Sequence, residues 1–213
     1  MVIVFVRSRL LSKYLSIFKT HIKNTRDHKR VMNVPKLIAV CGYKRCGKDT
    51  LCNYISSKYG HRHVKIAGRL KDITKILFGF SHEQLETDMK DVIDPTWGVT
   101  PRRVMQFIGT EMFQFKLQEC IPNIERNFWI RALLSDIASL HSQVVISDLR
   151  FVHEYKALKE KGYTIIKIEG KCNSGDPHSS ELEYQQIPPD LVIHNNETMQ
   201  HMYDQFDHWI NQT

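Results

Sequence analysis

The segment from Cys41 to Thr50, CGYKRCGKDT, constrains this chain more than any other feature of its sequence. It nearly matches the pattern G-x-x-x-x-G-K-[ST], in which glycines let the backbone close around a phosphate and the lysine reaches the terminal phosphates of a nucleotide. An apolar run precedes the segment and a helical pattern follows it, which is the order of strand, loop and helix that this chemistry needs. We therefore predict a phosphate-binding loop (P-loop) formed by Gly42, Lys44, Arg45, Gly47, Lys48, Asp49 and Thr50.

Asp49 departs from that pattern, because it stands where a hydroxyl residue normally meets magnesium. A carboxylate at this position is suited to bind Mg²⁺ directly or through water, since the ion prefers oxygen ligands. Without the cation, the same carboxylate would repel the phosphates. The sequence therefore predicts that nucleotide binding depends on magnesium, with Thr50 in a position to contact phosphate.

Beyond residue 35, short β-branched runs alternate with helical patterns, which is typical of a parallel sheet wound with helices. Strands are expected at residues 37–41, 63–66, 144–147, 164–169 and 191–194. Helices are expected at residues 48–58, 69–78, 101–119, 128–141, 151–161 and 198–212. The pattern predicts an α/β P-loop NTPase fold with a five-stranded parallel sheet and helices on both faces, and ligands in such folds gather at the carboxyl ends of the strands.

The chain length predicts a single folded domain. With 213 residues, 42% of them hydrophobic, it can bury one core of ordinary size, and we assign this domain to residues 35–213. The gap between the second and third strands is too long for a simple connection. It predicts a helical substrate-binding lobe at about residues 68–130, with a solvated packing excursion as the alternative.

The net charge of +7 resides in an N-terminal extension, residues 1–34. Residues 1–33 hold eight of the 30 basic residues and one of the 23 acidic ones, so the rest carries equal numbers of both. No nucleic-acid partner is therefore expected for the body. The extension suits an organelle-targeting peptide, a surface helix for anionic lipid, or sequence upstream of a start at Met32. Its apolar stretches are too interrupted for a transmembrane segment, and the five cysteines without C-x-x-C pairs favour a reducing, cytoplasmic location.

The third expected strand ends in VVISDLRF, which places Asp148 and Arg150 at its carboxyl end. In P-loop enzymes an acidic residue here holds magnesium or its water, so Asp49 and Asp148 are the predicted metal ligands. The alternative role for Asp148 is to cap the helix that follows. The two roles are compatible.

Two helix starts carry cations that oppose the helix dipole. Thr100 and Pro101 begin one helix, which leaves Arg102 and Arg103 in its first turn, and AGRLKD places Arg69 and Lys71 in another. A bound anion would relieve both conflicts, whereas a solvated arginine tolerates such a mismatch at about 0.3 to 1 kcal/mol. The pattern predicts a second phosphate pocket facing the first, with Lys48, Arg102, Arg103 and Arg150 as catalytic candidates for phosphoryl transfer.

Five segments occur in the order GYKRCGKDT, AGRLKD, WGVTPRRVMQFIGTEMF, ISDLRFVHEYKALKEKG and DPHSSELE…DLVIHNNET. From about Lys36 to the C-terminus, this series resembles the deoxynucleoside monophosphate kinases of bacteriophages and large DNA viruses. The resemblance implies transfer of the γ-phosphate of ATP to a deoxynucleoside monophosphate, with Mg²⁺, in the host cytoplasm if the protein is viral. It places Arg69, Lys71, Trp97, Arg102, Arg103, Gln106 and Asp148 on the acceptor side.

The role of Trp97 stays open between stacking on the acceptor base and packing the insertion against the body. His178 and Glu181 match the family pattern, but the pattern gives them no role. The chain departs from the phage proteins in its shorter insertion before Trp97 and in its basic extension, which leave base specificity and localisation open.

Other functions fit the sequence less well. A kinase for another small phosphorylated acceptor, such as phosphomevalonate, is the close alternative. A regulatory GTPase would need N-K-x-D and D-x-x-G motifs, which the corresponding segments lack. A homodimer is compatible with the sequence but has no specific support in it.

Overall fold

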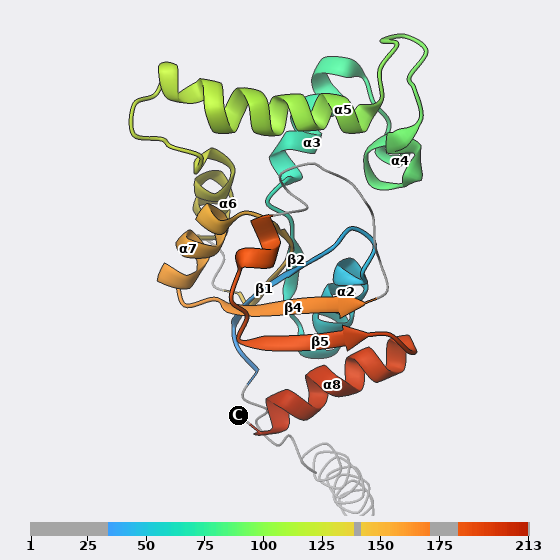
Figure 1. Ribbon diagram of the computed structural model, residues 1–213, viewed down its shortest axis with the longest axis vertical. Coiled ribbons are helices and arrows are strands. Elements are labelled where there is room, and N and C mark those ends of the chain that lie inside the picture. The colour runs from blue at the N-terminus through green and yellow to red at the C-terminus, as the bar shows by residue number, and fades with distance from the viewer. Residues whose placement is uncertain (1–33, 139–141, 171–182, 213) are drawn as a thin grey trace, which may run out of the picture. The chain divides into compact units, whose positions relative to one another are not determined.

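The computed structural model describes residues 34–138, 142–170 and 183–212, and Val34–Trp209 form one compact unit. Its centre is a five-stranded parallel sheet in the order β2-β3-β1-β4-β5 (Figure 1). The strands are β1 (Leu37–Gly42), β2 (Arg62–Val64), β3 (Val144–Leu149), β4 (Thr164–Gly170) and β5 (Leu191–Asn195). The predicted fold class is confirmed, although β2 ends two residues before the predicted strand, so Lys65 and Ile66 are loop residues.

Both faces of the central strand β1 are buried, and successive side chains of a strand point to opposite faces. Ala39 and Cys41 of β1 belong to a core cluster that includes residues of α6 (Phe128–Ala138) and α7 (Val152–Glu160). Ile38 and Val40 are also fully buried but lie outside that cluster. The opposite side carries α2 (Lys48–Tyr59) and α8 (Met199–Gln212). Tyr54 of α2 stacks on Tyr203 of α8, and Tyr59 packs edge-on against Phe206.

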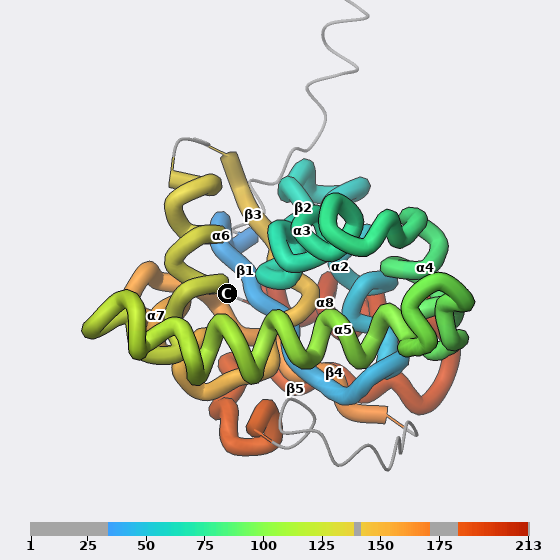
Figure 2. The backbone as a smooth tube through the Cα atoms, turned by 90° about the horizontal axis from the view of Figure 1, so that it is seen from above, coloured from blue at the N-terminus to red at the C-terminus, as the bar shows by residue number. Residues whose placement is uncertain are grey.

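The chain between β2 and α6 is mostly helical and lies apart from the strands, at the top of Figure 1. It contains α3 (Gly68–Phe78), α4 (His82–Glu86), a 3₁₀ turn η1 (Asp88–Asp91) and a long helical run over residues 101–119. Figure 2, viewed from above, shows this long run crossing in front of the sheet. The substrate lobe predicted at residues 68–130 stays a prediction about function.

The long run is one helix in the sequence prediction but three segments in the structure. It begins as α5 (Pro101–Gln106), continues as a π-helical segment η2 (Phe107–Phe115) and ends as a 3₁₀ turn η3 (Lys116–Glu119). The predicted start is confirmed, since the Thr100 side chain accepts a hydrogen bond from the Arg103 backbone and Pro101 is the first helical residue. The helical periodicity in the sequence did not reveal the change of pitch.

Several predicted features lie outside the described residues. They are the N-terminal extension, the end of the predicted helix at residues 139–141, and both His178 and Glu181. Among the described residues, no helix is both long and apolar enough to cross a membrane.

Candidate active site

The loop between β1 and α2 requires its glycines. Gly42 has φ 145°, and a Cβ atom there would lie 2.6 Å from the Ile168 carbonyl oxygen of β4. Gly47 has φ 100° and forms the N-cap of α2. Side chains rarely adopt these conformations, so glycine lets the loop curl back tightly between the strand and the helix. The loop follows β1, which lies between β3 and β4 in the sheet, so the strand order reverses at this position. Ligands in such folds bind at the carboxyl ends of the strands where this reversal occurs.

Lys48 is held inside this loop. Its side chain is 8% exposed, and Nζ donates to the carbonyl oxygens of Gly42, at 2.8 Å, and Tyr43. Its neighbour Asp49 accepts a hydrogen bond from Ser147 Oγ at 2.7 Å and lies 3.3 Å from Lys65 Nζ. Burial would raise the pKa of Asp49, but the Ser147 hydrogen bond and the Lys65 charge lower it below its usual value. The carboxylate is therefore ionised beside the phosphate loop at neutral pH.

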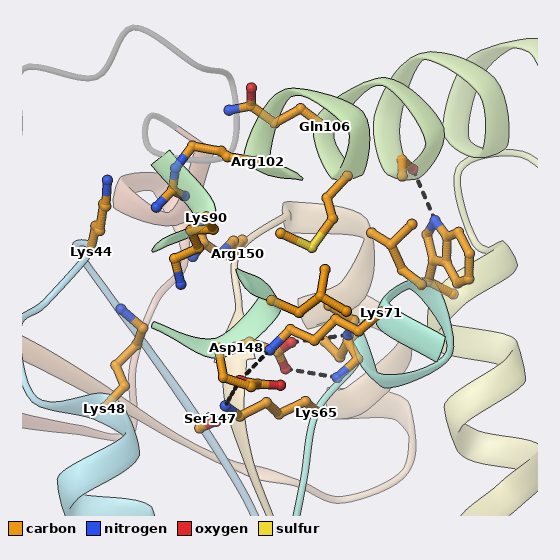
Figure 3. Close-up of a pocket in the computed structure, with 18 of the residues that line it drawn as sticks. Lys44, Lys48, Lys65, Lys71, Lys90, Arg102, Gln106, Ser147, Asp148 and Arg150 are labelled. Carbon is orange, nitrogen blue, oxygen red and sulfur yellow. Dashed lines mark hydrogen bonds and ion pairs between the residues drawn. The ribbon is translucent and has the colours of Figure 1, made fainter. Parts of the chain in front are cut away.

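A cavity of about 530 Å³ joins this loop to the helical insertion. Figure 3 shows Lys44 and Lys48 on the side of the loop, with Arg102 and Gln106 projecting from the helical run above them. The cavity is rich in cations, which suits an anionic ligand. Its basic lining residues are Lys44, Arg45, Lys48, Lys65, Lys71, Lys90, Arg102 and Arg150.

Acidic side chains hold some of these cations in place. Glu86 of α4 lies 2.6 Å from Lys71 Nζ and 3.3 Å from Lys65 Nζ. Arg102 binds Asp91 through two hydrogen bonds, and these hold the pKa of Asp91 at about 2. The carboxylate of Asp91 thus already balances the first-turn cation at Arg102, for which the sequence suggested a bound anion or solvent.

Three predicted acceptor-side residues do not line this cavity. Arg69 pairs with Asp136, with Nε 2.9 Å from the carboxylate, and Arg103 pairs with Glu111 at 3.1 Å. Trp97 packs edge-on against Phe78 at 5.1 Å and donates its Nε1 hydrogen to the Phe78 carbonyl oxygen. Of the two roles considered for Trp97, these contacts correspond to packing of the insertion. Of the predicted loop residues, Gly42, Gly47 and Thr50 shape or flank the site without lining the cavity.

Asp148 positions a neighbouring turn. Its two carboxylate oxygens accept hydrogen bonds from the backbone amides of Ile66, at 2.7 Å, and Ala67, at 3.0 Å, just before α3. The alternative role of capping the following helix is wrong. Glu154 does this instead, because its Oε2 accepts from the amides of Arg150 and Phe151 at the start of α7.

Glu154 is itself a notable group, since it lines the cavity and is 4% exposed. Burial disfavours its charged form, and the two amide hydrogen bonds compensate only in part. The result is a pKa raised to about 8.

The sequence analysis missed several lining residues, among them Lys65, Glu86, Lys90, Gln114, Trp129 and Ser147. Lys65 could have been found, because it follows β2 and the carboxyl ends of parallel strands meet at the ligand edge. Ser147 could have been found by the same rule, because it lies near the carboxyl end of β3. Glu86 and Lys90 carry no comparable signal, since charged residues on short surface helices are usually solvated.

The donor set at the loop fits a magnesium ion. Asp49, Thr50 and Ser147 offer oxygen ligands, and Asp148 lies on the same strand as Ser147. Among the described residues there is no cluster of three or more His, Cys, Asp or Glu side chains that would hold a metal by themselves. Magnesium commonly binds through one or two carboxylates together with substrate phosphates, so a sparse protein donor set is what such a site needs.

Comparison with known proteins gives consistent results. The family described as deoxynucleotide monophosphate kinase matches residues 72–206. A protein of Acanthamoeba polyphaga mimivirus, provisionally named deoxynucleotide monophosphate kinase, is 35% identical over 181 residues and covers 79% of this chain and 93% of its own length. The deoxynucleotide monophosphate kinase of Enterobacteria phage T4 is 24% identical over 239 residues, with coverage of 79% and 95%.

Among solved structures, dephospho-CoA kinase from Campylobacter jejuni is 13% identical with a TM-score of 0.47, and the match covers 83% of this chain and 96% of that one. The family match begins within α3 and runs through the helical insertion and the last three strands into α8. The chain therefore belongs to the deoxynucleotide monophosphate kinase family.

Proposed function

We propose that this protein transfers the γ-phosphoryl group of ATP to the phosphate of a deoxynucleoside monophosphate, which yields ADP and a deoxynucleoside diphosphate. The observation that carries the proposal is the single cavity that contains both the phosphate loop and the cations of the helical insertion. A transfer between two phosphates needs both of them in one enclosed space, and family membership makes the monophosphate the expected acceptor.

The reaction needs no protein nucleophile. An oxygen of the acceptor phosphate attacks the γ-phosphorus, a new P–O bond forms, and the bond to the β-phosphate oxygen breaks as ADP leaves. Catalysis then depends on holding the two phosphates in line and on stabilising the negative charge spread over the transferred group.

We assign the donor side to the P-loop and the acceptor side to the insertion. Lys48 and the loop amides would hold the ATP phosphates, and Asp49 would hold Mg²⁺ with Asp148 orienting the adjacent turn. When bound, the magnesium ion would neutralise phosphate charge. Lys71, Arg102 and Arg150 would position the acceptor phosphate, because they line the same cavity from α3, α5 and the end of β3.

The acidic partners of these cations give the site a means of staying ordered before substrate arrives. Asp91 and Glu86 hold Arg102 and Lys71 beside the cavity. A phosphate can then share or take over these cations, because Arg and Lys form strong charge-assisted hydrogen bonds with phosphate as well as with carboxylate.

The first experiment is ADP release from ATP and Mg²⁺ with a panel of deoxynucleoside and ribonucleoside monophosphates. Stimulation by one or more deoxynucleotides is expected, and Lys48→Ala should reduce the rate by about 10²- to 10³-fold, as is typical for loss of a charge-stabilising group. Lys156→Ala is the matched control, because Lys156 is exposed on α7 and does not line the cavity.

The acceptor panel also separates this function from its close alternative. If phosphomevalonate stimulates turnover and no nucleoside monophosphate does, the kinase chemistry stands and the acceptor assignment is wrong. A host-cytoplasmic location and a homodimer remain proposals, and size-exclusion chromatography with light scattering would test the second.

A further inference from the structure

The 3₁₀ turn η1 connects the helical insertion to the phosphate loop through two carboxylates. Asp88 pairs with Arg45 of the loop, and Asp91 lies 3.6 Å from Lys44 Nζ. Residues three positions apart in a 3₁₀ turn lie on the same side of it, so both carboxylates can face the loop together. These contacts fix the position of η1 relative to the phosphate loop.

Lys90, between these two acids in the sequence, lines the cavity and is half-buried. Within the described ranges its ammonium group has neither an acidic partner nor a hydrogen-bond acceptor. The acids on either side of it are already engaged, because Asp88 and Asp91 pair with the loop cations and Asp91 also binds Arg102. The described part of the chain therefore leaves the charge of Lys90 unpaired.

Neighbouring cations make this position unfavourable when the cavity is empty. Burial, together with the positive charges of Arg102 and Lys71, lowers the pKa of Lys90 below its usual value. Burial and like charges both disfavour the charged form of a lysine, and a bound anion offsets both effects. In the view of Figure 3, Lys90 lies below Arg102 and on the side of the loop lysines Lys44 and Lys48. The surroundings of Lys90 thus suit a phosphate.

The position of η1 indicates which phosphate this is. Asp91 contacts both Lys44, on the donor side, and Arg102, on the proposed acceptor side. Lys90 directly precedes Asp91 and lines the same cavity, so it lies at the boundary between the two sides. The group that occupies this boundary is the phosphoryl group as it passes from ATP to the acceptor.

We propose that Lys90 is a further catalytic residue, whose ammonium group contacts the transferred phosphoryl group and stabilises the charge on its oxygens in the transition state. This inference rests on the proposed function. The bond changes stay as described above: a P–O bond forms to the acceptor oxygen, and the bond to the β-phosphate oxygen breaks. No bond forms to Lys90, which keeps its protons throughout.

Lys90→Met tests this role, because methionine removes the charge and retains an unbranched side chain. The kcat should fall by about 10²-fold while the KM values for ATP and for the monophosphate stay within about threefold, as expected for an interaction made only in the transition state. Lys90→Arg keeps the charge and should recover part of the lost kcat. Lys75→Met is the matched control, because Lys75 is exposed on α3 and does not line the cavity.

Thermal unfolding without ligand separates this catalytic role from a structural one. Since Lys90 has like charges around it and no acidic partner among the described residues, Lys90→Met should have a Tm equal to or above that of the wild type. A clearly lower Tm would show that the lysine stabilises the fold and would overturn the inference. A raised KM for the monophosphate at unchanged kcat would also overturn it, because Lys90 would then only bind the acceptor.

A complex of ADP, Mg²⁺ and aluminium fluoride gives a readout that needs no acceptor, since the fluoride imitates the transferred phosphoryl group. Calorimetry should show at least about tenfold weaker binding of this complex to Lys90→Met, with ADP and Mg²⁺ alone unchanged. Equal binding of the fluoride complex to both proteins would overturn the inference. If no monophosphate stimulates turnover while the fluoride complex still binds the variant more weakly, the proposed acceptor is wrong and the contact made by Lys90 stands.

Discussion

At the residue scale, Asp49 is the unusual member of the phosphate loop. Its carboxylate is directly next to Lys48 in sequence, is bonded to Ser147 and lies near Lys65. These contacts keep it ionised, with its pKa below the usual value once burial has been offset. We therefore expect Asp49 to favour a metal-bound nucleotide over a metal-free one.

Asp49→Asn should reduce the magnesium dependence of ATP binding. In EDTA the wild type should bind ATP at least roughly tenfold more weakly than with Mg²⁺, because the Asp49 carboxylate then faces the phosphates without a cation. In the variant the ratio of the two dissociation constants should be smaller. Calorimetric titration with and without Mg²⁺ measures it. Asp204→Asn, at an exposed position on α8, should behave as wild type. An unchanged ratio in Asp49→Asn would remove Asp49 from the metal site.

Glu154 gives the protein a stability that depends on pH. Burial raises its pKa from 4.5 to about 8, so the folded state binds this proton more tightly than the unfolded state does. The contribution of Glu154 to the free energy of unfolding is therefore fully present below about pH 4.5, and it is lost as the pH rises through about 8.

Glu154→Gln should flatten that dependence. The amide oxygen can still accept from the backbone at the start of α7, but the side chain no longer becomes a buried charge at high pH. The difference in Tm between variant and wild type should grow in favour of the variant from pH 5 to pH 9. Glu160→Gln, exposed on the same helix, is the control. A difference in Tm that does not change with pH would contradict the raised pKa.

At the scale of elements, the contact between η2 and α3 shapes the cavity. A Cβ atom on Gly109 would lie 2.7 Å from Leu70 Cδ2, and the Gly109 carbonyl oxygen accepts the Trp129 hydrogen bond. Glycine thus allows the two helical segments to approach closely while the backbone also anchors α6. Both Leu70 and Gly109 line the cavity, so their packing sets its width.

Gly109→Ala should destabilise the fold by about 1 to 3 kcal/mol, the usual cost of overpacking a core contact. Adding Leu70→Ala should recover part of that loss, because the clash disappears. The effects of substitutions on the free energy of unfolding are not additive when the residues are in contact. Urea unfolding of both single variants and the double variant measures the coupling. Gly68→Ala is the matched control, since a Cβ there meets no atom within 4 Å. If the losses of unfolding free energy in the two single variants add up to the loss in the double variant, the contact between Gly109 and Leu70 is not tight.

At the scale of the whole molecule, the charge is divided unevenly along the chain. The basic excess belongs to residues 1–33, whereas every residue that lines the cavity lies between Lys44 and Glu154. The catalytic body is neutral by composition, and its cations are concentrated where phosphates are expected to bind.

Removal of residues 1–33 should therefore leave kcat and KM within about twofold of the full chain. It should also abolish any salt-sensitive binding to DNA, because that binding depends on the number of basic contacts. Steady-state kinetics and fluorescence anisotropy at several salt concentrations measure the two effects. Strong DNA binding by residues 34–213 alone would contradict the assignment of the charge to the extension.

The parallel sheet, the phosphate loop and most helix boundaries follow from the sequence alone. These features depend on local information: the alternation of apolar runs, the glycines at Gly42 and Gly47, and the Thr100–Pro101 helix start. Lys71, Arg102 and Arg150, which the sequence predicts as site residues, all line the cavity, since strand and helix ends in such a fold converge on one edge.

Which side chains meet depends on the three-dimensional fold. Arg69, Arg103 and Trp97 resemble ligand contacts in sequence, but they find partners in Asp136, Glu111 and Phe78. Asp148 bonds a turn some eighty residues earlier in the chain. Such pairings join distant segments, and no local pattern encodes them.

Gln114 shows the same limit through helix geometry. In a continuous α-helix, residues 102, 106, 110 and 114 would drift around the axis by roughly 120° in total. The wider turn of η2 changes that register, and all four of these residues line the cavity. The change in pitch and the hydrogen bonds from Arg126 to Gln114 arise from packing between distant segments, which no local sequence pattern encodes.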